Sequence, residues 1–133
     1  MRVVVMMIFM VVIHVGCVRG DKASPQSSQE LIDRIVNSEQ PVAVNFWARW
    51  CMACIALDPT LEELSREYAG KVQFVTVDVD LHREISQYFR IDAIPAVFII
   101  EDKTVRIAIN GMRDKDTYRN ALNDVLKLAE SRR

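Results

Sequence analysis

Glycine and proline are scarce in this chain of 133 residues, with four of each, and no stretch is of low complexity. That scarcity excludes a collagen-like protein, and a hydrophobic content of 50% argues against disorder. Charge of one sign is also lacking, because 17 basic residues balance 18 acidic ones and the basic residues are scattered. We therefore do not expect nucleic acid as a partner. The length suits one packed domain with a short appendage.

Potential ligands for metals and cofactors are few. The chain holds three cysteines and two histidines, whereas a structural zinc site normally takes four Cys or His ligands. His14 and Cys17 lie in an N-terminal apolar segment, so His82 alone remains to join the pair Cys51 and Cys54. A glycine-rich dinucleotide fingerprint such as GxGxxG is missing as well. We expect no metal site and no flavin or nicotinamide cofactor.

The N-terminus carries an unbroken apolar run, VVVMMIFMVVI at residues 3–13, behind the single basic residue Arg2. Even counted to Val18, it would span only about 24 Å as a helix, against a hydrocarbon core of about 30 Å. A buried core element is less favoured, because the run has neither the period of a strand nor that of a helix. We interpret residues 1–20 as an export signal or short membrane anchor, 21–29 as a polar linker and 30–133 as the folded domain.

Cys17 is a candidate lipid anchor. The dipeptide Gly16-Cys17 resembles the end of a bacterial lipoprotein signal, although His14 stands where an aliphatic residue is expected. The alternative is a cysteine that merely lies in or near an ordinary signal. With either reading we expect the domain outside the cytoplasm, in the periplasm or cell envelope, and associated with a membrane.

Hydrophobic periodicity predicts helices and strands in alternation. The first expected helix begins at Ser27 or Ser28 and ends near Ser38. Three further helices are expected at about 51–70, 81–89 and 114–130. The expected strands are 42–47, 72–77, 96–100 and 104–109, and the last two are close enough to form a hairpin. Helices that alternate with strands indicate an α/β layer protein.

The chemistry concentrates at Cys51 and Cys54, at the predicted start of a helix. Two cysteines at this spacing can form a small disulfide ring, and the helix N-terminus stabilises a thiolate at Cys51. Cys54 is then placed to resolve a mixed disulfide. A pair of cysteines at this spacing can also be half of a zinc site, but the chain offers too few further Cys or His ligands to complete one. Two inert core thiols would not suit the helix start or the flanking Trp47 and Trp50.

The segment NFWARWCMAC at residues 45–54, followed by Pro59, Ile94-Pro95 and Gly111, resembles thioredoxin. The resemblance covers residues 27–130. It implies a thioredoxin-like fold, with a central mixed sheet of four to five strands and helices on both faces. The first strand of a full thioredoxin has no clear counterpart in residues 23–29.

The resemblance also implies roles for individual residues. Cys51 would be the nucleophile and Cys54 the resolving thiol. Pro95 matches the family's cis proline, which would present the backbone of Ile94 to an extended substrate; without the resemblance it would be taken for a strand-edge proline. The residues expected to form an apolar substrate groove around Cys51 are Trp50, Ala93, Ile94, Pro95, Gly111 and Met112.

Four positions depart from the family's pattern. Asn45 stands where thioredoxins carry a buried aspartate, and Thr76 replaces the lysine that usually accompanies it. A carboxylate can accept the Cys54 proton during resolution and an amide cannot, so we expect Asn45 to modulate the reaction. Met52-Ala53 replaces the usual Gly-Pro and looks closer to the reductase domain of a membrane electron transporter that feeds periplasmic thiol oxidoreductases. The direction of electron flow stays open.

The sequence thus predicts a thiol-disulfide oxidoreductase, most simply a monomeric protein-disulfide reductase outside the cytoplasm. Its substrates would be protein disulfides, its redox group the Cys51 and Cys54 pair, and its electrons would come from an upstream protein donor. The alternative is a thioredoxin-like lipoprotein that binds clients in the groove with little turnover. Reduction of insulin disulfides would separate the two functions.

Overall fold

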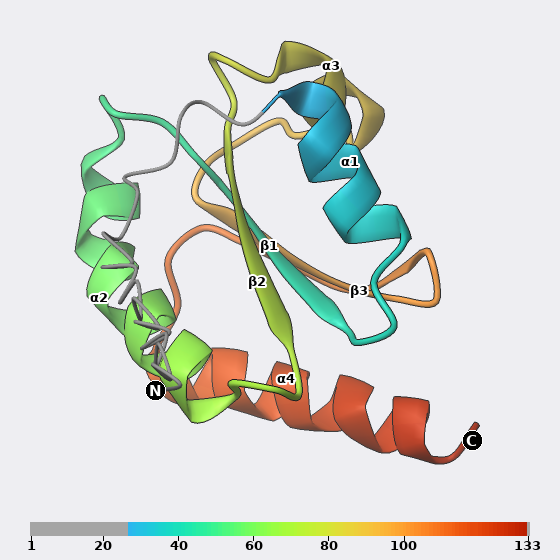
Figure 1. Ribbon diagram of the computed structural model, residues 1–133. Helices are drawn as coiled ribbons and strands as arrows, with labels where there is room; N and C mark the ends of the chain where they lie inside the picture. Colours follow the sequence, from blue (N-terminus) through green and yellow to red (C-terminus); the bar gives the residue numbers. More distant parts are fainter. Residues whose placement is uncertain (1–26, 133) are drawn as a thin grey trace, which may run out of the picture.

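A computed structural model describes residues 27–132, and helices alternate with strands along them (Figure 1). The elements are α1 (Ser28–Val36), β1 (Val42–Trp47), α2 (Met52–Glu67), β2 (Gln73–Asp78), α3 (Arg83–Tyr88), β3 (Ala96–Glu101), β4 (Thr104–Asn110) and α4 (Lys115–Glu130). Each expected helix and strand is therefore present, with α3 shorter than the predicted 81–89. The expected signal or anchor at 1–20, with Cys17, and the linker up to residue 26 lie outside the described residues.

The four strands form one mixed sheet in the order β2-β1-β3-β4. β1 pairs in parallel with β2 and antiparallel with β3, which in turn pairs antiparallel with β4. Asp102 and Lys103 join β3 to β4 and both have positive φ, as in a tight hairpin turn that follows the strand twist. Residues 27–132 contain no fifth strand, so the sheet has the smaller of the two expected sizes.

Helices cover both faces of this sheet, which confirms the expected thioredoxin-like α/β architecture (Figure 1). One core cluster joins the sheet to α2 and α4, and the other joins it to α1 and α3. Ala43 belongs to the first cluster, whereas Val42 and Val44 belong to the second. Since side chains alternate along a strand, Asn45 points to the face that α2 covers.

The N-terminus of α1 is closed by a reciprocal capping box. The Ser27 side chain accepts a hydrogen bond from the backbone of Glu30, and the Glu30 carboxylate accepts one from the Ser27 backbone. Leu31 and Ile35 then bury one side of the helix. The helix thus begins inside the stretch 21–29 that we assigned to the linker.

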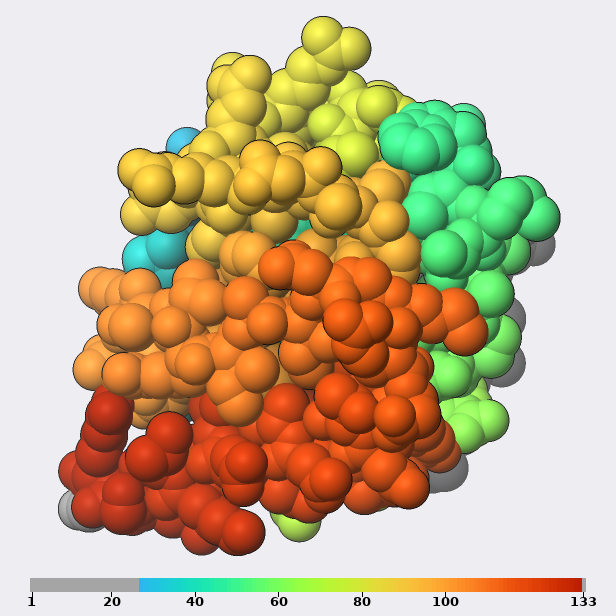
Figure 2. All heavy atoms as spheres, turned by 180° about the vertical axis from the view of Figure 1, so that it is seen from behind, coloured from blue at the N-terminus to red at the C-terminus, as the bar shows by residue number. Residues whose placement is uncertain are grey.

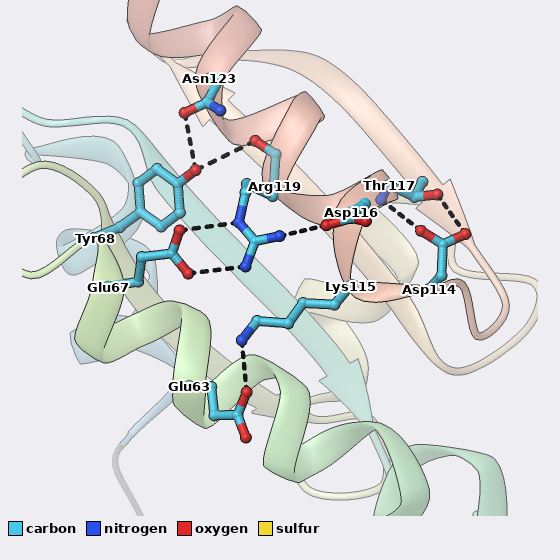
Figure 3. A network of polar contacts seen from close by, with 9 residues as sticks. All are labelled: Glu63, Glu67, Tyr68, Asp114, Lys115, Asp116, Thr117, Arg119 and Asn123. Atoms are coloured by element: carbon cyan, nitrogen blue, oxygen red, sulfur yellow. Dashed lines mark hydrogen bonds and ion pairs between the residues drawn. The ribbon is translucent and has the colours of Figure 1, made fainter.

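Two ion pairs connect α2 to α4 (Figure 3). Arg119 binds Glu67 through both carboxylate oxygens, at 2.9 and 3.2 Å, and also contacts Asp116. Lys115 lies 2.5 Å from Glu63. These hydrogen bonds lower the pKa of Glu67 and of Glu63, because they favour the charged carboxylates.

A buried tyrosine adds a neutral contact between the same two helices. The Tyr68 hydroxyl, at the C-terminus of α2, donates a hydrogen bond of 2.8 Å to Oδ1 of Asn123 in α4 (Figure 3). Burial raises the pKa of Tyr68, so the hydroxyl stays a donor. Together with the ion pairs, this contact ties α4 to α2, the helix that begins at the cysteine pair.

Candidate functional site

Cys51 is the N-cap residue of α2 and has an extended backbone, with φ −85° and ψ 99°. Its Sγ accepts a hydrogen bond of 3.1 Å from the backbone N–H of Cys54. The helix continues with the uncharged residues Met52 and Ala53, so no side chain offsets the positive end of the helix dipole there. This position favours a thiolate at Cys51 once the pair is reduced.

Cys51 and Cys54 form a disulfide, with their Cα atoms 5.2 Å apart. Both side chains are buried, with exposed fractions of 6% and 4%, so accessibility barely distinguishes them in this form. The two cysteines and Ala48 form a small cluster against which Trp47, Val79 and Ile94 pack. The sulfur atoms thus lie in an apolar setting beside the segment that contains Pro95.

The Ile94–Pro95 peptide bond is cis, as the resemblance implied. Ile94 is half-buried against the cysteine cluster, and Pro95 is buried. The Pro95 carbonyl accepts a hydrogen bond of 2.7 Å from the backbone N–H of Gly111. The structure therefore brings Ile94, Pro95 and the turn at Gly111 together, although they come from separate parts of the chain.

The turn after β4 is held in place by hydrogen bonds to a side chain of α4. Gly111 has φ +75°, a backbone conformation that is unfavourable for residues other than glycine. Its carbonyl accepts a hydrogen bond from the Tyr118 hydroxyl. The same hydroxyl accepts one from the backbone of Arg113. Met112, between these residues, is 51% exposed. In Figure 2 the green surface at the start of α2 lies at the same edge of the molecule as orange surface from this region.

Trp50, one of the predicted groove residues, is largely exposed, with 67% of its surface accessible. Its indole Nε1 donates a hydrogen bond of 2.9 Å to the carboxylate of Asp80. Asp80 was not among the residues predicted from the sequence. The available signal was its place after β2, because parallel neighbours β1 and β2 end at the same edge of the sheet.

Asn45 is buried, with 8% exposed, and its Oδ1 has no hydrogen-bond partner among the described residues. It lines a cavity of about 220 Å³ together with Thr76 of β2 and Asp58 of α2. Two of the departures from the family's pattern, Asn45 and Thr76, therefore line one cavity. Asp58 was not singled out from the sequence, although its spacing of four residues from Cys54 places both on one side of the helix.

Two further features concern metals and membranes. Within residues 27–132, no three His, Cys, Asp or Glu side chains are grouped so that they could hold a metal ion. His82 is buried at the start of α3, and its Nδ1 shares a hydrogen bond of 3.0 Å with the Ser28 hydroxyl. The helices of this described region are all too short or too polar to cross a membrane.

The thioredoxin family model matches residues 23–124. Mouse mitochondrial thioredoxin is 37% identical over 91 residues, which are 68% of this chain and 55% of that protein. Thioredoxin C-2 of Corynebacterium nephridii is 46% identical over 71 residues, 53% of this chain and 66% of its own length. Thioredoxin of Haemophilus influenzae is 35% identical over 89 residues, 67% of this chain and 83% of its own length.

The matched region thus spans about half the length of the mitochondrial relative but most of the bacterial one from Haemophilus. The family match covers the sheet, the cysteine pair at the start of α2 and the cis proline segment. On the sequence match and the fold together, the chain belongs to the thioredoxin family.

Proposed function

We propose that this protein reduces disulfide bonds in other proteins by thiol-disulfide exchange at Cys51 and Cys54. The observation that carries the proposal is the disulfide between these residues, placed where α2 begins and where the helix dipole favours a Cys51 thiolate. The cis Ile94–Pro95 segment beside it supports the proposal, because it can present backbone groups to an extended client.

The reaction has two exchange steps. The Cys51 thiolate attacks one sulfur of the client disulfide, which expels the first client thiolate and forms a mixed disulfide. The Cys54 thiol then loses its proton and attacks Cys51 Sγ, which expels the second client thiolate. Both client sulfurs take up protons from solvent. The client gains two electrons, and Cys51 and Cys54 end as the disulfide.

A protein dithiol is the electron donor that this cycle requires in the cell. It would attack the Cys51–Cys54 disulfide and return the pair to the reduced state by the same exchange chemistry. We further propose that the cycle runs outside the cytoplasm, on a domain anchored by residues 1–20 or by lipid on Cys17. The apolar run at residues 3–13 and the Gly16-Cys17 dipeptide support that location.

Insulin reduction tests the proposal on the full-length chain with dithiothreitol as the reductant. We expect insulin to precipitate faster with the wild-type protein than with Cys51→Ser. Cys17→Ala is the matched control, because it removes a cysteine outside the proposed site and should keep the wild-type rate. If Cys51→Ser is as fast as the wild type, the reductase function is wrong, and binding of clients without turnover becomes the better hypothesis.

A further inference from the structure

A cavity of about 220 Å³ lies between α2 and the neighbouring strands β1 and β2. Its polar lining residues are Asn45 and Thr76 from the strands and Asp58, Glu62 and Ser65 from the helix, and the apolar residues Leu61, Phe74 and Val75 complete the lining. A water molecule takes about 30 Å³ in the liquid, so the cavity has room for several. The side chains around it offer the hydrogen-bond partners that such water needs.

Asn45 is the buried end of this cavity. Its side chain is 8% exposed, and its Oδ1 is the one buried side-chain polar atom without a partner in residues 27–132. Buried acceptors in folded proteins are almost always hydrogen-bonded to protein or to water. Water in the cavity would supply the partner that the protein does not.

Asp58 belongs to the same cavity and is exposed to solvent. Among the described residues it makes no hydrogen bond and no ion pair, whereas Glu62 is paired with Arg66 at 2.7 Å. Asp58 and Glu62 are the titratable residues in the lining. Of these two carboxylates, Asp58 is therefore the one without an ion pair among the described residues.

The position of the cavity relative to the cysteines follows from helix and strand geometry. Cys54 and Asp58 are separated by four residues, so they lie one turn apart on the same side of α2. Asn45 points from β1 toward that helix, as the alternation with Val42 and Val44 requires. Asp58 and Asn45 line the cavity, and Cys54, which packs with Cys51 and Ala48, lies one helical turn before Asp58.

We propose that Asp58, acting through water bound at Asn45, accepts the proton of the Cys54 thiol when the mixed disulfide is resolved. This inference rests on the reductase function proposed above. The proton passes from Cys54 Sγ to water and from water to the Asp58 carboxylate, and the Cys54 thiolate attacks Cys51 Sγ and expels the client thiolate. The client thiolate takes a proton from solvent, and Asp58 returns its own to solvent.

Asn45 has a positioning role in this step. Its amide cannot take up a proton, but it can orient water, because Oδ1 accepts hydrogen bonds and Nδ2 donates them. A carboxylate at the exposed end of the cavity and an amide at the buried end together provide an acceptor without burying a charge beneath the sheet. Burying that charge unpaired would be costly.

The test measures the two thiols of the reduced full-length protein separately, in a Cys17→Ala background. The protein is mixed with an excess of an aromatic disulfide that releases coloured nitrothiobenzoate. One kinetic phase depends on reagent concentration and reports the attack by Cys51. A second phase is independent of that concentration and reports the attack of Cys54 on Cys51 Sγ.

We expect Asp58→Asn to slow the second phase about tenfold near neutral pH, less than the 10²–10⁴ of a directly placed base because water intervenes. The first phase should not change. Above the ordinary thiol pKa of about 8.5, the two rates should converge, because Cys54 then ionises without help. Asp58→Glu should keep the wild-type second phase, since the carboxylate is retained.

Glu62→Gln is the matched control, because it removes the other carboxylate of the cavity and should leave both phases unchanged. Simple loss of negative charge would lower the pKa of Cys54 and speed resolution, so the sign of the effect identifies the role. An equal or faster second phase in Asp58→Asn, or an equal slowing in Glu62→Gln, would overturn the proposal. If the wild type itself shows no second phase, the reductase function fails instead.

Discussion

Trp50 and Asp80 are joined by a hydrogen bond of 2.9 Å from the indole Nε1 to the carboxylate, across the ends of the parallel strands β1 and β2. The bond holds a largely exposed aromatic ring beside the cysteine pair. A ring held in one orientation loses less entropy when a client binds. The pair therefore connects the sheet edge to the expected substrate surface.

Replacement of Asp80 by Asn tests that connection. We expect KM for insulin to rise by about twofold to fivefold, because a charge-assisted hydrogen bond of about 1.5–3 kcal/mol becomes a weaker neutral one at an exposed site. The midpoint of urea unfolding should change little. Thr104→Ala, at the far end of β4, is a control that should alter neither KM nor the insulin reduction rate. An unchanged KM in Asp80→Asn would mean that the ring position does not matter for clients.

Cys51 should be the first thiol to react when the reduced protein meets a small alkylating reagent near neutral pH. The two cysteines are almost equally buried, so the helix N-terminus at Cys51, and not accessibility, decides the order. Mass spectrometry of peptides after brief exposure to iodoacetamide measures the label at each site. Preferential label on Cys54 would contradict the assignment of the nucleophile.

Acid should weaken the contact between α2 and α4. The pKa of Glu67 is lowered mainly by its hydrogen bond with Arg119, so the folded state binds this proton less readily than the unfolded chain does. Its contribution to stability is present above the unfolded pKa of about 4.3 and is lost as pH falls through the lower folded value. Glu67→Gln should therefore be less stable than wild type near neutral pH, and the difference should shrink in acid.

Urea unfolding midpoints across this pH range measure the effect for Glu67→Gln. Glu39→Gln is the control, because Glu39 makes no ion pair among the described residues and should show no such trend. We expect only a small difference, since the pair lies at the surface, where ion pairs are screened. A difference that stays constant from acid to neutral pH would rule out the ion pair as its cause.

Asn45→Asp should restore a proton acceptor at the buried end of the cavity. Resolution by Cys54 should become faster near neutral pH, and the pKa of Cys51 should rise by about one unit through repulsion between like charges. Thiolate absorbance against pH measures the second effect. An unchanged Cys51 pKa would mean that residue 45 is remote from the thiols or that water screens it.

The same variant should lose stability as pH rises. The buried carboxyl would have a raised pKa in the folded state, so the unfolded chain would release its proton at a lower pH than the folded protein does. The free energy of unfolding should therefore fall as pH rises above the unfolded pKa of about 3.9. Asn45→Ala, which adds no titratable group, separates this pH-dependent loss from simple loss of packing.

Membrane association stays a prediction that rests on residues 1–20. Cell fractionation should find the full-length protein with membranes outside the cytoplasm, and Cys17→Ala should release it if lipid is the anchor. Retention of Cys17→Ala in the membrane fraction would favour the apolar run as the anchor. Recovery of the intact chain from the cytoplasm, with Met1 in place, would contradict both.

Much of this protein could be predicted from local sequence. The elements followed from periodicity because burial of one helix face or of a whole strand leaves its pattern in neighbouring residues, as Leu31 and Ile35 show in α1. The spacing of Cys51 and Cys54 at a helix start likewise predicted the pair that forms the disulfide, since the size of the disulfide ring and the helix dipole are local properties.

Only the tertiary structure decided which distant residues meet. The sheet order β2-β1-β3-β4 brings Asp80 to Trp50, and the packing of α2 on β1 places Asp58 and Asn45 at one cavity. The hydrogen bond from Gly111 to Pro95 depends in the same way on how β3 and β4 are joined and where α4 packs. These contacts join residues that lie far apart in the sequence, so no local pattern predicts them. They depend on how the whole chain packs its buried residues.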